Sequence, residues 1–232
     1  MEIKDSVALV TGANRGIGHA FVRALVDHGA AKVYAGVRDL ATVADPDVTP
    51  LQLDVTNPAE IAAATEAADD VSIVINNAAV DSQSTKLLDG SLDDARHAME
   101  VNYFGTWAVS RAFAPVLARN GGGALVNMLS VASWIGEPAL PGYAASKAAQ
   151  WSLTQSLRQG LRDQGTLVVG VHAGFVETDL SARFDAPKIT PASVAEQTMQ
   201  ALADNSTEVL ADERTRQVKA GLGRSGNGRS PN

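Results

Sequence analysis

The sequence predicts an α/β protein built on a parallel sheet. Short apolar runs alternate with longer helical patterns along most of the 232 residues, which is typical of repeated β-α-β units. Apolar residues make up 45% of the chain and charged residues 19%, a balance that indicates a folded globular protein and not a disordered one. A chain of this length is able to form one α/β domain with a large core.

Seven short apolar runs are predicted strands, and each is separated from the next by a longer stretch. Parallel neighbours cannot be joined by a tight turn, so the stretches between them are expected to contain helices. The predicted strands cover residues 7–10, 32–37, 50–55, 71–75, 124–129, 167–172 and 208–210.

Several predicted helices carry start and stop signals. Asn57, followed by Pro58 and Glu60, reads as a helix cap, a first-turn proline and a reciprocal glutamate, and Thr190-Pro191 repeats the first two signals. Glycines at 29, 121–123 and 165 mark helix ends, each just before a predicted strand. The longest helical patterns cover residues 17–27, 92–118 and 144–162.

No linker or repeat divides residues 1–220, which are expected to form one domain. Residues 221–232 contain four glycines and almost no apolar side chain, a composition typical of a flexible C-terminal tail. The fold prediction therefore concerns residues 1–220.

Composition excludes several classes of protein. The absence of cysteine removes disulfides, thiolate catalysis, cysteine-ligated zinc and iron–sulfur clusters. His19, His28, His97 and His172 are too far apart in sequence for a compact metal motif, so no metal is expected. A net charge of −7 argues against nucleic acid as a partner. With no apolar signal core and no stretch of ~18 apolar residues, a cytoplasmic protein without a membrane partner is expected.

A glycine-rich turn follows the first predicted strand and opens a helical pattern. Residues 11–18 read TGANRGIG. Glycine lets the backbone turn sharply and approach a pyrophosphate, and the helix N-terminus offers free N–H groups to the anion. We therefore expect a dinucleotide here, the alternative being an ordinary tight turn of an unrelated α/β protein. The candidate cofactor contacts in this turn are Gly12, Asn14, Arg15, Gly16, Ile17 and Gly18.

A second group of candidates surrounds the start of a later helical pattern. Tyr143 and Lys147 are four residues apart on one helix face, where a lysine charge could lower the pKa of the phenol, although such pairs are also common on helix surfaces. Ser130 follows the fifth predicted strand, where open α/β sheets bind ligands, and could hold a carbonyl oxygen. Ser133 is an alternative that the sequence does not separate from Ser130. Asn102 is unusual as an amide in the middle of a helical pattern.

These motifs occur in the order found in the short-chain dehydrogenase/reductase family, which the sequence resembles from residue 7 to about residue 212. The resemblance implies a Rossmann-like fold, in which a doubly wound sheet of seven parallel strands lies between helices in three α/β/α layers. It also implies an NADP(H)-preferring enzyme similar to carbonyl reductases. It rests on residues 11–18, Asp54-Val55, residues 76–79, Asn102 with Gly105, Ser130, Tyr143 with Lys147, and residues 174–178.

The resemblance gives each of four catalytic candidates a role. Tyr143 would exchange a proton with the substrate oxygen, and Ser130 would bind and polarise the carbonyl group. Lys147 would lower the pKa of Tyr143 and hold the hydroxyls of the nicotinamide ribose. Asn102 would hold a water molecule that links Lys147 to solvent.

Cofactor contacts outside the glycine turn are also implied by the resemblance. Asp54 would bind the adenine, Asn76 would stabilise the sheet edge near the ribose, and Thr178 would meet the carboxamide. The other implied contacts are Arg38, Val55, Ala78, Gly174 and Val176, together with Tyr143 and Lys147.

Three departures from the family pattern concern cofactor geometry and assembly. Ala79 stands where glycine is usual and Ala173 where proline is common, and both changes are small enough to keep the cofactor geometry. The Val-Asp-Gly-Gly ending of many members, which often supports a tetramer contact, is absent from residues 208–213. We therefore expect a homodimer packed through two long central helices, or a homotetramer.

Charges at the end of the second predicted strand favour NADP(H) over NAD(H). A 2′-phosphate needs cations, whereas an NAD-selective site places a carboxylate here. Arg38 at this point and Arg15 in the glycine turn could converge on the phosphate. Asp39 keeps NAD(H) open as the alternative, because its carboxylate could meet the ribose if the strand ended one residue later. We expect Asp39 instead to start the next turn.

The expected substrate pocket is mostly apolar and suits an aldehyde or ketone with an apolar group. Arg183 and Lys188, within a lid expected at residues 180–189, keep open a substrate that carries a carboxylate or a phosphopantetheine group. By position, the pocket includes Ser130, Val131, Trp134, Ile135, Phe175 and residues 80–83.

The function favoured by these observations is the reversible, NADPH-dependent reduction of a small-molecule ketone or aldehyde to an alcohol. One alternative is a 3-oxoacyl thioester reductase, which a basic docking patch would favour and a net charge of −7 does not. Another is a non-catalytic, NADP-binding regulator on the same fold. Intact Tyr143 and Lys147 argue against a regulator.

Overall fold

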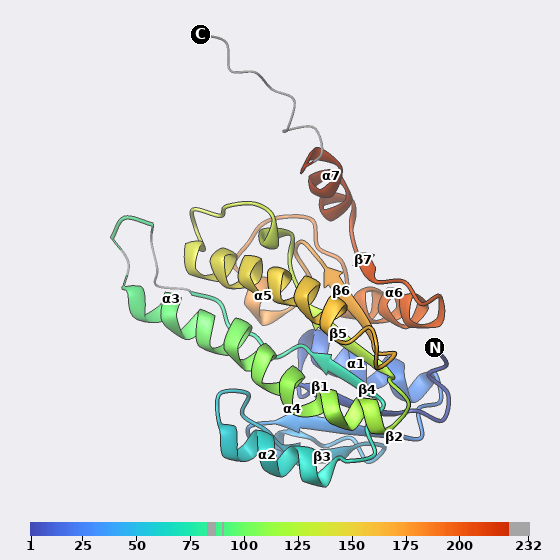
Figure 1. The fold of residues 1–232 in the computed structure, drawn as a ribbon. Coiled ribbons are helices and arrows are strands. Elements are labelled where there is room, and N and C mark those ends of the chain that lie inside the picture. The colour runs from blue at the N-terminus through green and yellow to red at the C-terminus, as the bar shows by residue number, and fades with distance from the viewer. Residues whose placement is uncertain (83–86, 90, 223–232) are drawn as a thin grey trace.

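The structure, a computed structural model, describes residues 1–82, 87–89 and 91–222. Its centre is a sheet of seven parallel strands in the order β3-β2-β1-β4-β5-β6-β7, as expected for a Rossmann-like fold (Figure 1). The order reverses between β1 and β4, so this is the point where such a sheet leaves room for a ligand. The strands are β1 (Val7–Thr11), β2 (Lys32–Val37), β3 (Thr49–Gln52), β4 (Ile73–Asn76), β5 (Ala124–Met128), β6 (Leu167–His172) and β7 (Glu208–Leu210).

Helices cover both faces of the sheet, which gives three layers. Helices α1 and α6 pack together on one face, and α2, α4 and α5 cover the other (Figure 1). No helix within the described residues is long and apolar enough to cross a membrane. The helices are α1 (Gly16–Asp27), α2 (Pro58–Ala67), α3 (Leu92–Met99), α4 (Thr106–Arg119), α5 (Pro141–Gly160), α6 (Pro191–Ala203) and α7 (Glu213–Leu222).

Alternate side chains of the central strands fill two separate cores. Along β1, Ala8 and Val10 belong to the core beneath α1 and α6, whereas Leu9 belongs to the core beneath α2 and α4. All three side chains are fully buried. Parallel strands buried on both faces have near-continuous apolar sequences, which is why the apolar runs located the strands.

The third strand is shorter than the predicted 50–55, because side chains of the next turn take over the backbone partners. β3 ends at Gln52, and the Asp54 N–H donates to Glu60 Oε2 at 2.7 Å. The Asp54 carboxylate in turn accepts the N–H of Thr56 at 2.8 Å. The chain therefore leaves the sheet near Asp54, at the same edge as the carboxyl ends of the other strands.

The helical pattern predicted at 92–118 forms three consecutive pieces. A π-helical segment, η2 (Glu100–Gly105), separates α3 from α4 and contains Asn102. The Asn102 side chain accepts the N–H of Val80 at 2.9 Å and donates to the Val80 carbonyl at 2.8 Å. The mid-helix amide is therefore satisfied by a loop that follows β4.

Helix α7 lies beyond the elements that the sequence signals indicated. The boundary expected between residues 220 and 221 falls inside this helix, which ends at Leu222. The rest of the expected tail, residues 223–232, lies outside the described residues. Two residues separate β7 from the last described helix, and Arg214 in the first turn of that helix lines the cavity.

Candidate active site

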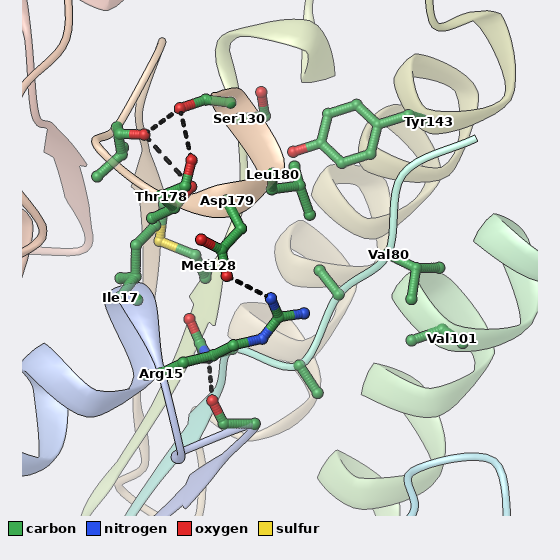
Figure 2. A pocket seen from close by; sticks show the side chains of 18 of the residues that line it. Arg15, Ile17, Val80, Val101, Met128, Ser130, Tyr143, Thr178, Asp179 and Leu180 are labelled. Carbon is green, nitrogen blue, oxygen red and sulfur yellow. Dashed lines mark hydrogen bonds and ion pairs between the residues drawn. The ribbon is translucent and has the colours of Figure 1, made fainter. Parts of the chain in front are cut away.

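A cavity of about 660 Å³ lies at the carboxyl ends of the central strands (Figure 2). Its lining brings together the glycine turn, the ends of β2 and β5, the start of α5 and the segment after β6. Among the described residues there is no group of three or more His, Cys, Asp or Glu side chains arranged to hold a metal ion. The predicted site residues in the lining are Gly12, Asn14, Arg15, Gly16, Ile17, Gly18, Arg38, Asp54, Val55, Ala78, Ser130, Val131, Tyr143, Lys147, Gly174, Phe175, Val176 and Thr178.

The glycine turn has the geometry that a dinucleotide requires. Gly12 has a φ of +63°, a conformation that favours glycine. A Cβ on Gly18 would lie 2.0 Å from the carbonyl oxygen of Gly12, so only glycine allows the helix to approach the turn this closely. Arg15 is the N-cap of α1, and within the described chain its side chain makes no capping hydrogen bond. The first-turn N–H groups of α1 therefore suit a pyrophosphate.

Asn77 fastens the glycine turn to β4, a function that the motif analysis missed. Its side-chain nitrogen donates to the carbonyl oxygens of Thr11 and Gly12 at 3.0 and 3.1 Å. The Thr11 hydroxyl accepts the N–H groups of Asn77 and Ala78, both at 3.0 Å. Asn76, which was expected to stabilise the sheet edge near the ribose, donates to Asn127 of the neighbouring strand β5 and to Ser110, and it is outside the described cavity lining.

The charged residues expected near a 2′-phosphate occupy the outer part of the cavity. Arg15, in the glycine turn, forms an ion pair at 2.7 Å with Asp179, which lies in the segment after β6 (Figure 2). Both side chains are largely exposed, so this pair contributes little stability and is easily exchanged for another anion. Asp39 caps the short helix η1 (Leu40–Thr42) by accepting the N–H of Ala41 at 3.0 Å. Asp39 therefore starts the next turn, as expected, and Arg38 lines the cavity before it.

Asp54 is held in its charged form at the adenine end expected from the sequence. Burial opposes ionisation, but hydrogen bonds from the backbone and the hydroxyl of Thr56 outweigh it and keep the pKa of Asp54 below its usual range. Asp54 Oδ1 accepts both bonds, which orients the carboxylate at the cavity wall.

The two candidate serines have different surroundings. Ser130 follows β5 and is the N-cap of the short helix η3 (Val131–Ser133), where its hydroxyl accepts the N–H of Ala132 at 3.1 Å. Ser133 accepts the N–H of Ser130 at 3.3 Å, so its hydroxyl closes the turn. Ser130 lines the cavity beside Tyr143 (Figure 2). The geometry therefore separates the turn residue Ser133 from the candidate catalytic residue Ser130.

Tyr143 and Lys147 are both held toward their neutral forms. Burial raises the pKa of Tyr143 to about 12, with a hydrogen bond to Ser130 opposing the shift and the charge of Asp81 adding to it. Burial also lowers the pKa of Lys147 to about 7. Lys147 is not among the groups that shift the pKa of Tyr143 here, so the expected lowering by Lys147 stays a prediction. The lysine nitrogen lies 5.8 Å from the centre of the tyrosine ring, and its own charge is disfavoured by burial.

Lys147 is positioned by a buried polar network. Its Nζ donates to the Met128 carbonyl and to Gln150 Oε1, both at 2.8 Å. The Gln150 side-chain nitrogen donates to the Thr106 hydroxyl at 2.9 Å, and that hydroxyl donates to the Asn102 carbonyl at 2.8 Å. Gln150 was not singled out in the sequence, because nothing marks a helical glutamine as buried. Asn102 is outside the described cavity lining; its carbonyl belongs to this network, and its side-chain nitrogen donates to Ser146, next to Lys147, at 2.9 Å.

Trp134 is not part of the substrate end, contrary to expectation. The centre of its ring lies 3.9 Å from that of the His172 ring, on which it stacks. The side-chain nitrogen of Lys219, a residue of α7, lies 4.8 Å from the centre of the Trp134 ring. The His172 imidazole in turn donates from Nδ1 to the Ser130 carbonyl at 3.2 Å. Trp134 therefore supports the turn that carries Ser130 from behind, outside the described cavity lining.

The substrate end otherwise contains the expected apolar side chains. Val131, Ile135 and Phe175 line it, and the expected lid adds Leu180 and Phe184. Val80 of the expected segment 80–83 also lines the cavity, whereas Gln83 lies outside the described residues. Arg214 of α7 completes this end, and no sequence signal pointed to it.

Comparisons with known proteins identify the family to which a chain with this fold and cavity is similar. A family model described as short chain dehydrogenase matches residues 6–188. An uncharacterized oxidoreductase of Staphylococcus aureus (strain USA300) is 32% identical over 213 residues, which cover 86% of this chain and 92% of the relative.

Two solved structures are similar over nearly the whole chain. A short chain dehydrogenase from Burkholderia cenocepacia in complex with NADP has a TM-score of 0.93 and 36% identity, covering 97% of both chains. A short chain dehydrogenase/reductase from Burkholderia phymatum in complex with NAD has a TM-score of 0.85 and 27% identity, covering 100% of this chain and 99% of that one.

Proposed function

This chain belongs to the short-chain dehydrogenase/reductase family, and we propose that it is an oxidoreductase that uses NADPH to reduce a ketone or aldehyde to an alcohol. The observation that carries the proposal is the meeting of two hydroxyl groups, those of Ser130 and Tyr143, in a cavity that also contains the glycine turn. A carbonyl oxygen placed between the two hydroxyls would accept a hydrogen bond from each.

The residues of the cleft fit a nicotinamide dinucleotide. The turn at 12–18 and the N-terminus of α1 would hold the pyrophosphate, and Asp54 would hold the adenine. Val176 and Thr178, after β6, would contact the nicotinamide end, where Lys147 would hold the ribose hydroxyls. When bound, the reduced nicotinamide supplies the hydride.

Arg15 and Arg38 support NADPH as the preferred cofactor. A 2′-phosphate would attract both guanidinium groups, and the exposed Arg15–Asp179 pair costs little to open. Asp39 has its carboxylate in the cap of η1, which leaves it less suited to a ribose diol. One similar structure contains NADP and another contains NAD, so the preference rests on the residues of this chain.

Side chains of the protein would donate a proton to the substrate oxygen and then reprotonate the donor. With a pKa raised to about 12, the Tyr143 phenol is protonated at neutral pH and is able to donate to the substrate oxygen. Ser130 would hold that oxygen and stabilise its developing charge. Lys147, with a pKa near 7, is able to return a proton toward Tyr143, and Met128 and Gln150 fix its nitrogen for this purpose.

A second copy of the chain is proposed as a partner. Phe104, in η2, and Trp107, in the first turn of α4, are each nearly half exposed, and Tyr103 packs against both rings. An apolar helix face of this kind supports a homodimer, or a homotetramer, packed through α4 and α5.

The proposal is tested by incubating the purified protein with NADPH or NADH and a panel of aromatic and aliphatic aldehydes, ketones and 3-oxoacyl thioesters. We expect carbonyl-dependent oxidation of NADPH, faster than that of NADH. Turnover confined to thioesters would replace the proposal with a 3-oxoacyl reductase. Tight NADPH binding with no turnover of any carbonyl would contradict it and favour a non-catalytic regulator.

A further inference from the structure

Four side chains form a continuous stack at the outer part of the substrate end. The Arg183 guanidinium lies 4.9 Å from the centre of the Phe184 ring, which lies 5.0 Å from that of Phe175. The Arg214 guanidinium also lies 4.9 Å from the centre of the Phe175 ring. Phe175, Phe184 and Arg214 line the same cavity as Ser130 and Tyr143, so a substrate that fills it reaches both ends.

The two arginines of the stack differ in their charge partners. Arg183 forms an ion pair with Asp81 at 2.9 Å, and the Asp81 side chain is only 6% exposed. Across the residues that the structure describes, no carboxylate lies within ion-pair distance of Arg214. Its acidic neighbour Glu213 pairs instead with Arg216 at 3.1 Å. Arg214 therefore presents an unneutralised guanidinium at the cavity.

Asp212 holds Arg214 in this place. Asp212 Oδ2 accepts the N–H of Gly174, the residue before Phe175, at 2.5 Å. Asp212 Oδ1 accepts the N–H of Thr215 at 2.8 Å and its hydroxyl at 3.0 Å, and Thr215 is fully buried. One carboxylate thus ties the chain at Phe175 to the first turn of α7. The packing of α7 against the segment at Phe175 therefore fixes the position of the Arg214 backbone.

We propose that Arg214 selects substrates that carry a carboxylate beyond the carbonyl group to be reduced, that is, oxo acids with an apolar or aromatic segment. This inference rests on the proposed reductase function and specifies its substrate class. The carbonyl would lie at Ser130 and Tyr143, the apolar segment against Phe175 and Phe184, and the carboxylate at the planar, two-pronged guanidinium of Arg214.

The charges around this end favour a carboxylate over a phosphate. Glu137 and Glu177 also line the cavity, and a phosphate dianion facing them would need more than one free cation. Glu137 Oε1 accepts the N–H of Ala139 at 3.2 Å, and as a carboxylate it offers an anion no donor, whereas the Arg214 guanidinium does. A single guanidinium matches a single carboxylate in both charge and shape.

The test compares an acid with its own methyl ester, since the two differ in charge at one position. Substrates are 4-acetylbenzoate and methyl 4-acetylbenzoate, and 4-oxopentanoate and its methyl ester, each with NADPH. The variants are Arg214→Met, which keeps the length of the side chain over Phe175, and Arg214→Lys, which keeps the charge. Arg216→Met is the matched control on the same helix, because Arg216 bonds Glu213 and the Leu210 carbonyl.

We expect the wild type to reduce at least one acid with a higher kcat/KM than its ester. Arg214→Met should lower the acid-to-ester ratio of kcat/KM by about 10- to 100-fold, mainly through KM for the acid, whereas Arg216→Met should leave the ratio unchanged. Arg214→Lys should restore part of the ratio and keeps the test valid if Arg214→Met does not fold.

Two outcomes overturn the inference in distinguishable ways. If the wild type reduces neutral ketones and prefers no acid, or if no Arg214 variant changes the ratio, the substrate class is wrong and the reductase function stands. If the wild type reduces no carbonyl compound in either panel, the proposed function fails and the inference fails with it.

Discussion

At one end of the cleft, consecutive residues between β1 and α1 form the glycine turn, whereas at the other end Ser130, Tyr143, Phe175 and Arg214 come from four separate segments. The first end is made of backbone, with Gly12 and Gly18 in contact distance of each other. The second is made of side-chain functional groups held on a packed frame. A substitution that adds a side-chain atom should therefore disrupt the structure of the glycine turn. A substitution that removes a functional group should instead impair catalysis or binding at the other end.

The largest effect is expected at the end made of side chains. Tyr143→Phe removes only the hydroxyl, so kcat for carbonyl reduction should fall by about 10²- to 10⁴-fold because the proton donor is lost. NADPH affinity, measured by fluorescence titration, should change little. Tyr103→Phe is the control, because Tyr103 packs against Phe104 and Trp107 away from the cavity. Activity of Tyr143→Phe close to that of the wild type would contradict the assignment.

At the glycine turn, a substitution should lower the stability of the fold and not only the rate of catalysis. In Gly18→Ala the new Cβ would lie 2.0 Å from the Gly12 carbonyl oxygen and 2.6 Å from Asn77 Nδ2, so α1 must move away from the turn. We expect a loss of about 3 kcal/mol in the free energy of unfolding, measured in guanidinium chloride, together with loss of NADPH binding.

Gly160→Ala is the control for this loss. Gly160 ends α5, and a Cβ there would meet nothing within 4 Å, so its stability should be unchanged or slightly higher. Equal stability of the two alanine variants would show that close packing at Gly18 is not what fixes the turn.

The buried lysine should make stability depend on pH. Because the pKa of Lys147 is about 7 in the folded chain and about 10.4 when unfolded, the unfolded chain binds more protons between these values. The destabilising contribution is fully present below pH 7 and disappears as the pH rises toward 10. Relative to Lys147→Met, the wild type should gain up to about 1.4 kcal/mol per pH unit across this window.

The measurement is the free energy of unfolding of both proteins from pH 6 to pH 10. Lys4→Met, at an exposed site near the N-terminus, is the control and should follow the wild type. A difference between wild type and Lys147→Met that does not vary with pH would mean that Lys147 stays charged in the folded protein.

The smallest effect is expected in the preference between cofactors. Arg38→Asp replaces a cation near the expected 2′-phosphate with a carboxylate, so the ratio of kcat/KM for NADPH to that for NADH should fall by about tenfold or more. Asp39→Asn should leave this ratio nearly unchanged, because Asp39 caps η1. The reverse pattern would assign the ribose to Asp39 and make NADH the preferred cofactor.

The sequence predicted the parts of the molecule whose cause is local. The central strands are buried on both faces and so read as apolar runs, and the glycine turn is contiguous. Ser130 and Tyr143 were recognisable because each stands at a fixed offset from a strand end or a helix start. All of these meet in one cavity in the structure.

The parts that the sequence did not predict depend on tertiary partners. Trp134 was predicted to line the pocket from its position in the sequence, but in the structure its ring contacts His172 and Lys219. Gln150 is buried against Lys147, and Arg214 reaches Phe175 only because Asp212 bonds both Gly174 and Thr215. Pairings between distant segments leave no periodic or motif signal in the chain.

The central claim is that the cleft transfers a hydride from NADPH to a carbonyl carbon while the protein protonates the oxygen. The most direct test is to supply NADPH carrying deuterium at one or the other position of the reactive nicotinamide carbon, together with a ketone that the protein reduces. The account predicts that the product alcohol contains deuterium on its carbinol carbon with one labelled cofactor and none with the other. NADPH consumption with no deuterium in the alcohol from either label would contradict it.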